Sequence, residues 1–296
     1  MKKILLAIVI LSIFLVPAYA SEKSISIGFP PGYNESDINI DYVKRGKEKV
    51  KLGKNFGAIQ DFDKAININS KNASAYLGRG LAKHNLGQPI EAIQDYDKAI
   101  VLNPNNALAY WFRGDAKSDL NKLNEAFQDY DKAISLNPKE SGIYFSRGNA
   151  KFNLNKHLEA IQDYDKAISL NSKDVLSYIN RGNAKHELRY YSDALQDYDK
   201  AIALEPRESL GYFNRARTKY VLGEFIDSMQ DINKAINLNP NEAKFYKLRE
   251  LIQQEVSKNS SFRSNTKQNF RTEEQIDRLE QELQDIEFLQ IYQLVN

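Results

Sequence analysis

One acidic phrase recurs along the chain and contains the residues whose types could do chemistry. It reads QDYDKAI at residues 94–100, and its variants place an aspartate at Asp61, Asp95, Asp129, Asp163, Asp197 and Asp231. Paired carboxylates can bind a divalent cation or transfer protons. On a helix, however, residues two apart diverge by about 200°, so Asp95 and Asp97 point to different sides. Because active sites occur once or a few times per protein, six copies favour a structural function.

No other constellation indicates catalysis or a bound cofactor. The chain has no cysteine, which excludes disulfides and thiolate metal sites. The histidines His84 and His186 are 102 residues apart, too far along a repeated chain to share a metal ion. We find no nucleophile with a neighbouring base and no phosphate-binding loop. The sequence therefore predicts no enzyme, no catalytic or metal-binding residue, no cofactor and no small-molecule substrate.

The first 20 residues differ from the rest and predict export. They have a basic start, a thirteen-residue apolar run and Ala18-x-Ala20, the layout of a secretory signal cleaved after Ala20. An uncleaved membrane anchor is the alternative, although the run is short for a span of about 20 residues. We expect a periplasmic or secreted protein, with a bacterial envelope favoured, that contacts a membrane only through an uncleaved signal.

The predicted mature chain carries no net charge. Of the 41 basic residues, the signal removes Lys2 and Lys3, which leaves 39 against 39 acidic residues. A neutral chain gives no bulk electrostatic attraction to nucleic acid, so we expect no nucleic-acid partner.

The acidic phrase returns every 34 residues, a period typical of stacked repeats. Within one copy, Ala92, Tyr96 and Ala99 lie on one helical stripe. Pro104 cannot continue that helix, and Asn106 is suited to cap the next one, which starts at about Ala107. Each unit therefore reads as helix, turn, helix, turn.

These units resemble the tetratricopeptide repeat family. With units at 39–72, 73–106, 107–140, 141–174, 175–208 and 209–242, the fourth position is always Tyr and the twenty-seventh always Ala. The eighth is Gly in five units and Ala216 in the last, and the twenty-fourth is aromatic in five and Ile232 in the last. The resemblance implies an all-α, right-handed helix-turn-helix solenoid of six repeats. We attribute the small eighth residue to close helix approach and the twenty-fourth ring to filling the interior.

In the resembling proteins the first helix of each unit lines a concave groove that binds a peptide or protein segment. The corresponding positions here carry amides that suit a peptide backbone and aromatic rings that suit an anchor. The groove candidates are Trp111, Phe112, Phe145, Asn149, Asn180, Asn183, Phe213, Asn214 and Arg217. Phe152 and Tyr220 lie beside them, and several of these rings could instead pack helix on helix. The predicted function is a non-enzymatic interaction scaffold.

A second regularity places cations at the seventh and eleventh positions of every unit. The seventh is always Arg and the eleventh always Lys. We predict that the arginines pair with the aspartates of the acidic phrase, within a unit or across to the next, in a charge lattice; the alternative is a basic stripe for an acidic ligand. The predicted lattice residues are Arg79, Arg113, Arg147, Arg181, Asp95, Asp129, Asp163 and Asp197.

The ends of the chain differ from the repeats. Residues 21–38 read as a leader, 243–257 as a capping helix and 258–270 as a polar linker. Residues 271–296 read as an amphipathic helix opened by Thr272 and Gln275 in a capping box. This tail helix could fold back on the stack, which we favour, or pair with another chain. The second possibility makes a self-associating assembly component the alternative function.

Overall fold

The computed structural model describes residues 35–260 and 272–283, and within these ranges it is entirely helical apart from turns. The predicted signal peptide, most of the leader, most of the linker and residues 284–296 lie outside the described residues. None of the described helices is long and apolar enough to cross a membrane. The helices are α2 (Glu35–Lys51), α3 (Asn55–Ile68), α4 (Ala73–His84), α5 (Pro89–Leu102), α6 (Ala107–Asp119), α7 (Leu123–Leu136), α8 (Ser141–Asn153), α9 (His157–Leu170), α10 (Val175–Glu187), α11 (Tyr191–Leu204), α12 (Ser209–Leu222), α13 (Phe225–Leu238) and α14 (Ala243–Ser260).

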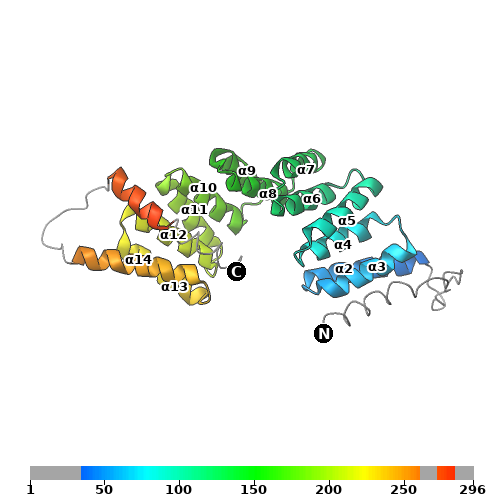
Figure 1. The fold of residues 1–296 in the computed structure, drawn as a ribbon, viewed down its shortest axis with the longest axis horizontal. Coiled ribbons are helices and arrows are strands. Elements are labelled where there is room, and N and C mark those ends of the chain that lie inside the picture. The colour runs from blue at the N-terminus through cyan, green and yellow to red at the C-terminus, as the bar shows by residue number, and fades with distance from the viewer. Residues whose placement is uncertain (1–34, 261–271, 284–296) are drawn as a thin grey trace, which may run out of the picture.

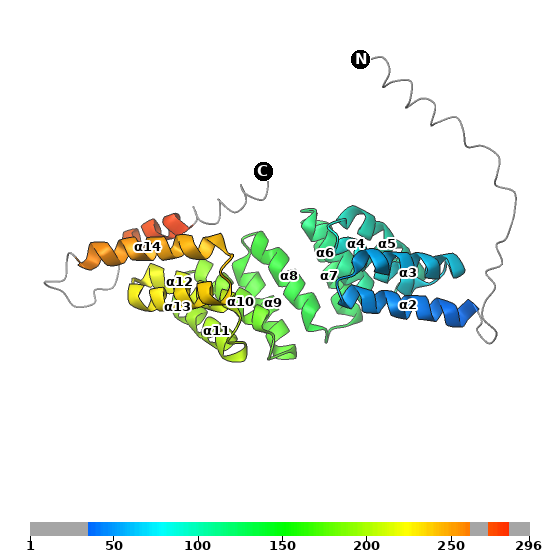
Figure 2. The same ribbon diagram turned by 90° about the horizontal axis from the view of Figure 1, so that it is seen from below.

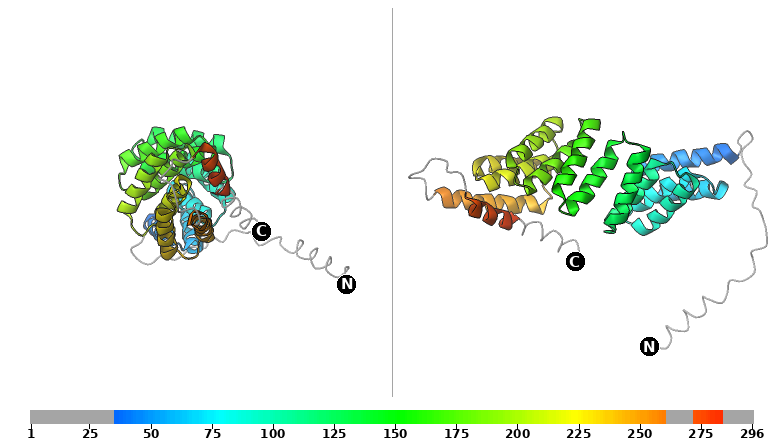
Figure 3. Two further views of the ribbon diagram at one scale, coloured as in Figure 1. Left: turned by 90° about the vertical axis from the view of Figure 1, so that its left-hand side faces the viewer. Right: turned by 90° about the horizontal axis from the view of Figure 1, so that it is seen from above.

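The helices form antiparallel pairs that stack along a curved path (Figure 1). Each even-numbered helix from α2 to α12 packs against the odd-numbered helix that follows it, and against the even-numbered helix of the next pair. Figures 2 and 3 show that the stack winds around an axis and is longer than it is wide. The protein is therefore a solenoid of helix-turn-helix units, which confirms the predicted fold class.

The turn inside each unit contains a residue with a left-handed backbone. The fifteenth position of the six units has φ between 57° and 80°. Glycine or asparagine tolerates this conformation best, and five units use one of them. The residues are Gly53, Gly87, Asn121, Asn155, Arg189 and Gly223. Arg189 is the exception among them.

The aromatic residue of the acidic phrase forms the interior of each unit. Tyr96, Tyr130, Tyr164 and Tyr198 are fully buried. Each ring lies against the glycine at the eighth position of its own unit: a Cβ on Gly114 would come 2.8 Å from Cε1 of Tyr130. The eighth residue is thus small because a ring covers it, a more specific reason than helix approach alone.

The first unit differs at its start from the prediction. Helix α2 begins at Glu35, four residues before the predicted unit start at Asn39 and inside the segment we expected to be a leader. Residues 35–38 contain no proline or glycine, and the acidic Glu35 and Asp37 suit the amino end of a helix. The other five units begin their first helices at the predicted residues.

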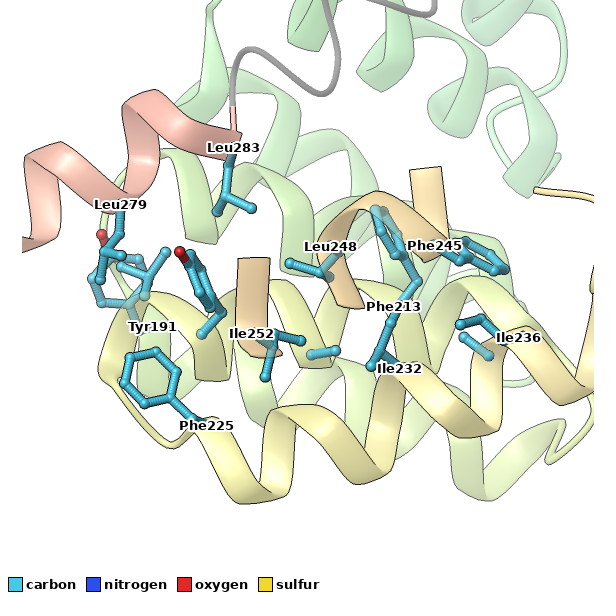
Figure 4. Close-up of a cluster of buried hydrophobic side chains, with 14 residues drawn as sticks. Tyr191, Phe213, Phe225, Ile232, Ile236, Phe245, Leu248, Ile252, Leu279 and Leu283 are labelled. Atoms are coloured by element: carbon cyan, nitrogen blue, oxygen red, sulfur yellow. The ribbon is translucent and has the colours of Figure 1, made fainter. Parts of the chain in front are cut away.

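The carboxyl-terminal part of the described chain folds back on the stack. Helix α14 packs against α13 and α12, and residues 273–283 form a further helical segment. Leu279 and Leu283 of that segment join a buried cluster with Phe213, Phe245 and Ile252 (Figure 4). Of the two arrangements considered for the tail helix, its described part adopts the folded-back one.

Candidate functional site

The first aspartate of each acidic phrase is buried between two cations of its own unit. The side chain of Asp95 is 5% exposed. Arg79 donates to it through Nε at 3.0 Å and Nη2 at 2.6 Å, and Lys83 Nζ lies 2.7 Å away. Because the same contacts recur in every unit, the structure brings together all the predicted Arg–Asp partners: Arg113 with Asp129, Arg147 with Asp163 and Arg181 with Asp197.

The second aspartate connects one unit to the next. Nη1 of Arg79 donates to Asp63 of the preceding unit at 2.6 Å. Arg113 reaches back to Asp97 in the same way at 2.6 Å. Each of these guanidinium groups also lies over the fourth-position tyrosine of its unit, at 4.9–5.8 Å from the ring centroid. The phrase therefore contributes to the structure in three ways. Its first aspartate forms an ion pair within the unit, its aromatic ring fills the interior, and its second aspartate bonds to the arginine of the next unit.

This pairing also holds the first carboxylate of the first unit in its charged form. The hydrogen bonds from Arg45 lower the pKa of Asp61 to about 2, so that carboxyl stays ionised near neutral pH. The paired arginines and lysines do not form a free basic stripe, the alternative we considered for them. Among the described residues, no group of histidine and carboxylate side chains could hold a metal ion.

The buried tyrosine hydroxyls of three units donate hydrogen bonds to the side chain at the ninth position of their own units. Tyr164 donates to Oδ1 of Asn149 at 2.8 Å, and Tyr198 donates to Oδ1 of Asn183 at 2.9 Å. Tyr130 donates to Asp115 at 2.9 Å. The second unit has Leu81 at this position, and the hydroxyl of Tyr96 is buried without a hydrogen-bond partner among the described residues.

The asparagines that were predicted to form a ladder come together in part. Nδ2 of Asn180 donates to Oδ1 of Asn149 at 2.9 Å, which joins two units across the face. Within the described residues, no protein group bonds to Nδ2 of Asn149, Nδ2 of Asn183 or Oδ1 of Asn180. All three side chains are partly exposed. The face therefore presents two amide donors and one acceptor in orientations that the internal hydrogen bonds select.

Trp111, Phe112 and Phe145 are partly buried and pack against the cores of the units. Nε1 of Trp111 donates to Ser146 at 2.8 Å, and its ring lies on Gly142, where a Cβ would come 2.2 Å from it. The ring of Phe112 lies 5.2 Å from that of Trp111, and the ring of Phe145 lies 6.1 Å from that of Tyr164. Much of this aromatic surface thus joins consecutive units.

Three predicted groove residues are buried, and for these the prediction was wrong. Phe213, Asn214 and Arg217 are 8%, 6% and 8% exposed. The ring of Phe213 lies 4.9 Å from that of Phe245 in α14, and Nη2 of Arg217 donates to Glu187 at 3.1 Å. Tyr220 is also fully buried. The predicted residues that stay partly exposed therefore lie on α6, α8 and α10 and not on α12.

The prediction from the sequence missed Asp115, the ninth-position residue of the third unit. Burial raises its pKa to about 6, against the hydrogen bond from Tyr130 and the charge of His84. The spacing of fifteen residues between the ninth position and the tyrosine was visible in the sequence and pairs Asp115 with Tyr130 as it pairs Asn149 with Tyr164.

We expect Asp115→Asn to stabilise the protein at neutral pH but not in acid. The raised pKa means that folding favours the protonated carboxyl, so the contribution of Asp115 to stability is largest below pH 4 and falls as the pH rises to about 6. An uncharged asparagine could accept the hydrogen bond from the Tyr130 hydroxyl, as Asn149 and Asn183 accept those from Tyr164 and Tyr198 in the next two units. Urea unfolding at pH 4 and pH 7.5 should show the variant ahead by about 1 kcal/mol only at pH 7.5. An equal difference at both values would contradict this.

Comparison with known proteins agrees with this fold. A family model described as TPR repeat matches residues 46–87, 114–155 and 148–188, and two described as tetratricopeptide repeat match 73–106 and 175–208. A search of proteins with curated functions gave no match.

Solved structures resemble the chain in fold at low sequence identity. A chain of the APC/C hetero-tetramer Cut9–Hcn1 has a TM-score of 0.66 and 18% identity over 72% of this chain and 42% of that one. The structure of pilF from Pseudomonas aeruginosa has a TM-score of 0.65 and 19% identity, and the match covers 75% of this chain and 99% of that one. The structure of YrrB, described as a TPR protein with an unusual peptide-binding site, has a TM-score of 0.52 and 20% identity, and the match covers 65% of this chain and 97% of that one.

The family models together match residues 46–106 and 114–208, more than half of the chain. The structure agrees with these matches: its helices are paired and regularly stacked, and in four units a buried tyrosine lies on the eighth-position glycine. The chain belongs to the tetratricopeptide repeat family.

Proposed function

We propose that the protein is a non-enzymatic scaffold that binds an extended peptide or protein segment on the concave surface of α6, α8 and α10. The observation that carries this is the orientation of Asn149, Asn180 and Asn183. Their internal hydrogen bonds turn two amide donors and one acceptor toward the face. An extended backbone offers carbonyl and N–H groups that match such a set.

The surrounding surface supports the same ligand. Trp111 on α6 and Phe145 on α8 are partly exposed and would offer apolar contact for side chains of the segment. Asp115 adds a carboxylate at the other end of the row. YrrB, which shares the fold at 20% identity, is described as having a peptide-binding site, so a solenoid of this kind can hold a peptide.

We also propose that the protein acts outside the cytoplasm, in a bacterial envelope or secreted. This rests on the layout of residues 1–20, with their basic start, apolar run and small residues before the cleavage point. The amino-terminal sequence of the protein recovered from an envelope fraction tests it: a chain that starts at Ser21 supports export with cleavage. A chain found only in the cytoplasm with Met1 retained would contradict it.

A peptide selected on the protein tests the groove. We expect a peptide obtained by phage display against residues 21–296 to lose at least tenfold in affinity when Asn180 and Asn183 are changed to Ala, because each lost amide leaves a backbone group unsatisfied at about 1–3 kcal/mol. Calorimetry measures the change. Asn105→Ala, in the turn between α5 and α6, is the matched control and should leave affinity unchanged. Equal affinity for all three proteins would place the peptide elsewhere.

A further inference from the structure

The helical segment at residues 273–283 packs on the last repeats through both apolar and polar contacts. Leu279 and Leu283 are 0% and 7% exposed, and they enter the buried cluster that contains Tyr220, Leu248 and Ile252 (Figure 4). These two leucines are four residues apart, so they lie on one face of the helix. The apolar half of the contact is thus a leucine pair that joins a cluster built mostly from α12, α13 and α14.

The polar half of the contact pairs three carboxylates with three donors. Arg189, in the turn before α11, forms an ion pair with Asp277. The hydroxyl of Tyr191 donates to Glu280 at 2.5 Å. The hydroxyl of Tyr220 donates to Glu282 at 2.7 Å. The donors come from three separate places in the stack, whereas the acceptors lie on one short helix.

The backbone conformation of Arg189 supports the same contact. It has φ of 62° at a turn position where the other five units use glycine or asparagine. An arginine in this conformation is strained by about 1–2 kcal/mol, and such strain persists where the side chain is needed. The guanidinium at this position meets Asp277, which explains why the fifth unit departs from the others.

We propose that this surface, formed by Arg189, Tyr191, Tyr220, Leu248 and Ile252, is a binding site for acidic amphipathic helices, with residues 273–283 as its built-in occupant. We call it the end surface. The partner that fits is a helix of another protein with leucines four apart and carboxylates at −2, +1 and +3 from the first leucine. The end surface uses none of the asparagines of the groove, so this proposal goes beyond the function proposed above.

The built-in occupant sets the conditions for binding a partner. A tethered segment acts at an effective concentration on the order of millimolar, so a helix from outside binds only if it competes with that. The native protein therefore rejects weak acidic helices and accepts those that bind more tightly than its own segment.

Fluorescence anisotropy with a labelled peptide of residues 271–296 tests the end surface on the full chain. Leu279→Asp with Leu283→Asp opens the surface by placing carboxylates in the cluster. We expect the opened protein to bind the peptide at least tenfold more tightly than the wild type does. In the opened protein, Tyr220→Phe should weaken binding about tenfold by removing one buried charge-assisted hydrogen bond.

Arg189→Gly separates binding from folding. Glycine relieves the strained turn, so the opened protein with this change should unfold at the same temperature or higher, yet bind the peptide about threefold more weakly. If circular dichroism shows that the double aspartate variant is unfolded, Asp277→Lys with Glu280→Lys and Glu282→Lys opens the surface instead. Absence of binding by a folded opened protein, equal binding by the wild type, or binding indifferent to Tyr220→Phe would each overturn the proposal.

Discussion

Replacing Asp163 with alanine is expected to lower the free energy of unfolding by about 3–5 kcal/mol, while Asp165→Ala lowers it by less than about 1 kcal/mol. Both residues belong to one acidic phrase. The side chain of Asp163 is 5% exposed and accepts from Arg147 at 2.6 Å, with Lys151 at 2.8 Å. Removing it leaves Nε and Nη2 of Arg147 and the ammonium of Lys151 without their buried acceptor, and the exposed Asp131, 2.6 Å from Nη1 of Arg147, does not replace it. Losing the buried member of an ion pair in this way is costly.

Asp165 is the matched control because it accepts from the same kind of group in an exposed place. Its side chain is 53% exposed, and its partner Arg181 keeps Asp197 when Asp165 is removed. Exposed pairs contribute little because water screens them. The first and second aspartates of the phrase therefore contribute different free energies, although they are the same residue type in the sequence.

Urea unfolding followed by circular dichroism measures both variants. A stack of repeats can unfold in more than one step, so the midpoint and slope should be compared together. Asp163→Ala combined with Arg147→Met and Lys151→Met should recover part of the loss, because it removes the unpaired charges. Equal destabilisation by the two aspartate variants would show that the lattice is not built from a buried and an exposed member.

Much of the fold and of the lattice could be predicted because they depend on spacing alone. A period of 34 residues places Arg147 and Asp163 at the same relative positions as Arg113 and Asp129, so one correct pairing predicts the others. The unit boundaries follow from turn residues such as Pro104 and Asn106, which act locally.

The candidate groove was predicted less well because its carboxyl-terminal end is covered by a helix outside the repeats. The prediction treated Phe213 and Arg217 like their counterparts in earlier units. The sixth unit, however, packs against α14, which is not paired with a regular second helix, and the ring of Phe213 stacks near Phe245. Sequence periodicity carries no information about a surface that a non-periodic segment covers.

The last unit departs from the others in a second way that leads to a testable coupling. It has Ala216 at the eighth position and Ile232 at the twenty-fourth, where the fourth unit has Gly148 and Tyr164. All four residues are buried. The two units thus fill similar space with either a glycine and a large ring or an alanine and a smaller side chain.

Gly148→Ala is therefore expected to destabilise the protein by about 1–3 kcal/mol, because the new Cβ would lie 2.8 Å from Cε1 of Tyr164 in a fully packed interior. Tyr164→Ile alone should also destabilise, by leaving a cavity and removing the hydroxyl that bonds to Asn149. The double variant restores the pairing of the sixth unit, so its loss should be at least about 1 kcal/mol smaller than the sum of the single losses. Urea unfolding of the four proteins gives this double-mutant cycle.

Gly57→Ala, whose Cβ would meet only Lys49 at 3.4 Å, is the control and should be neutral or slightly stabilising. Additive losses in the cycle would mean that the glycine is needed for the approach of the two helices and not for the ring.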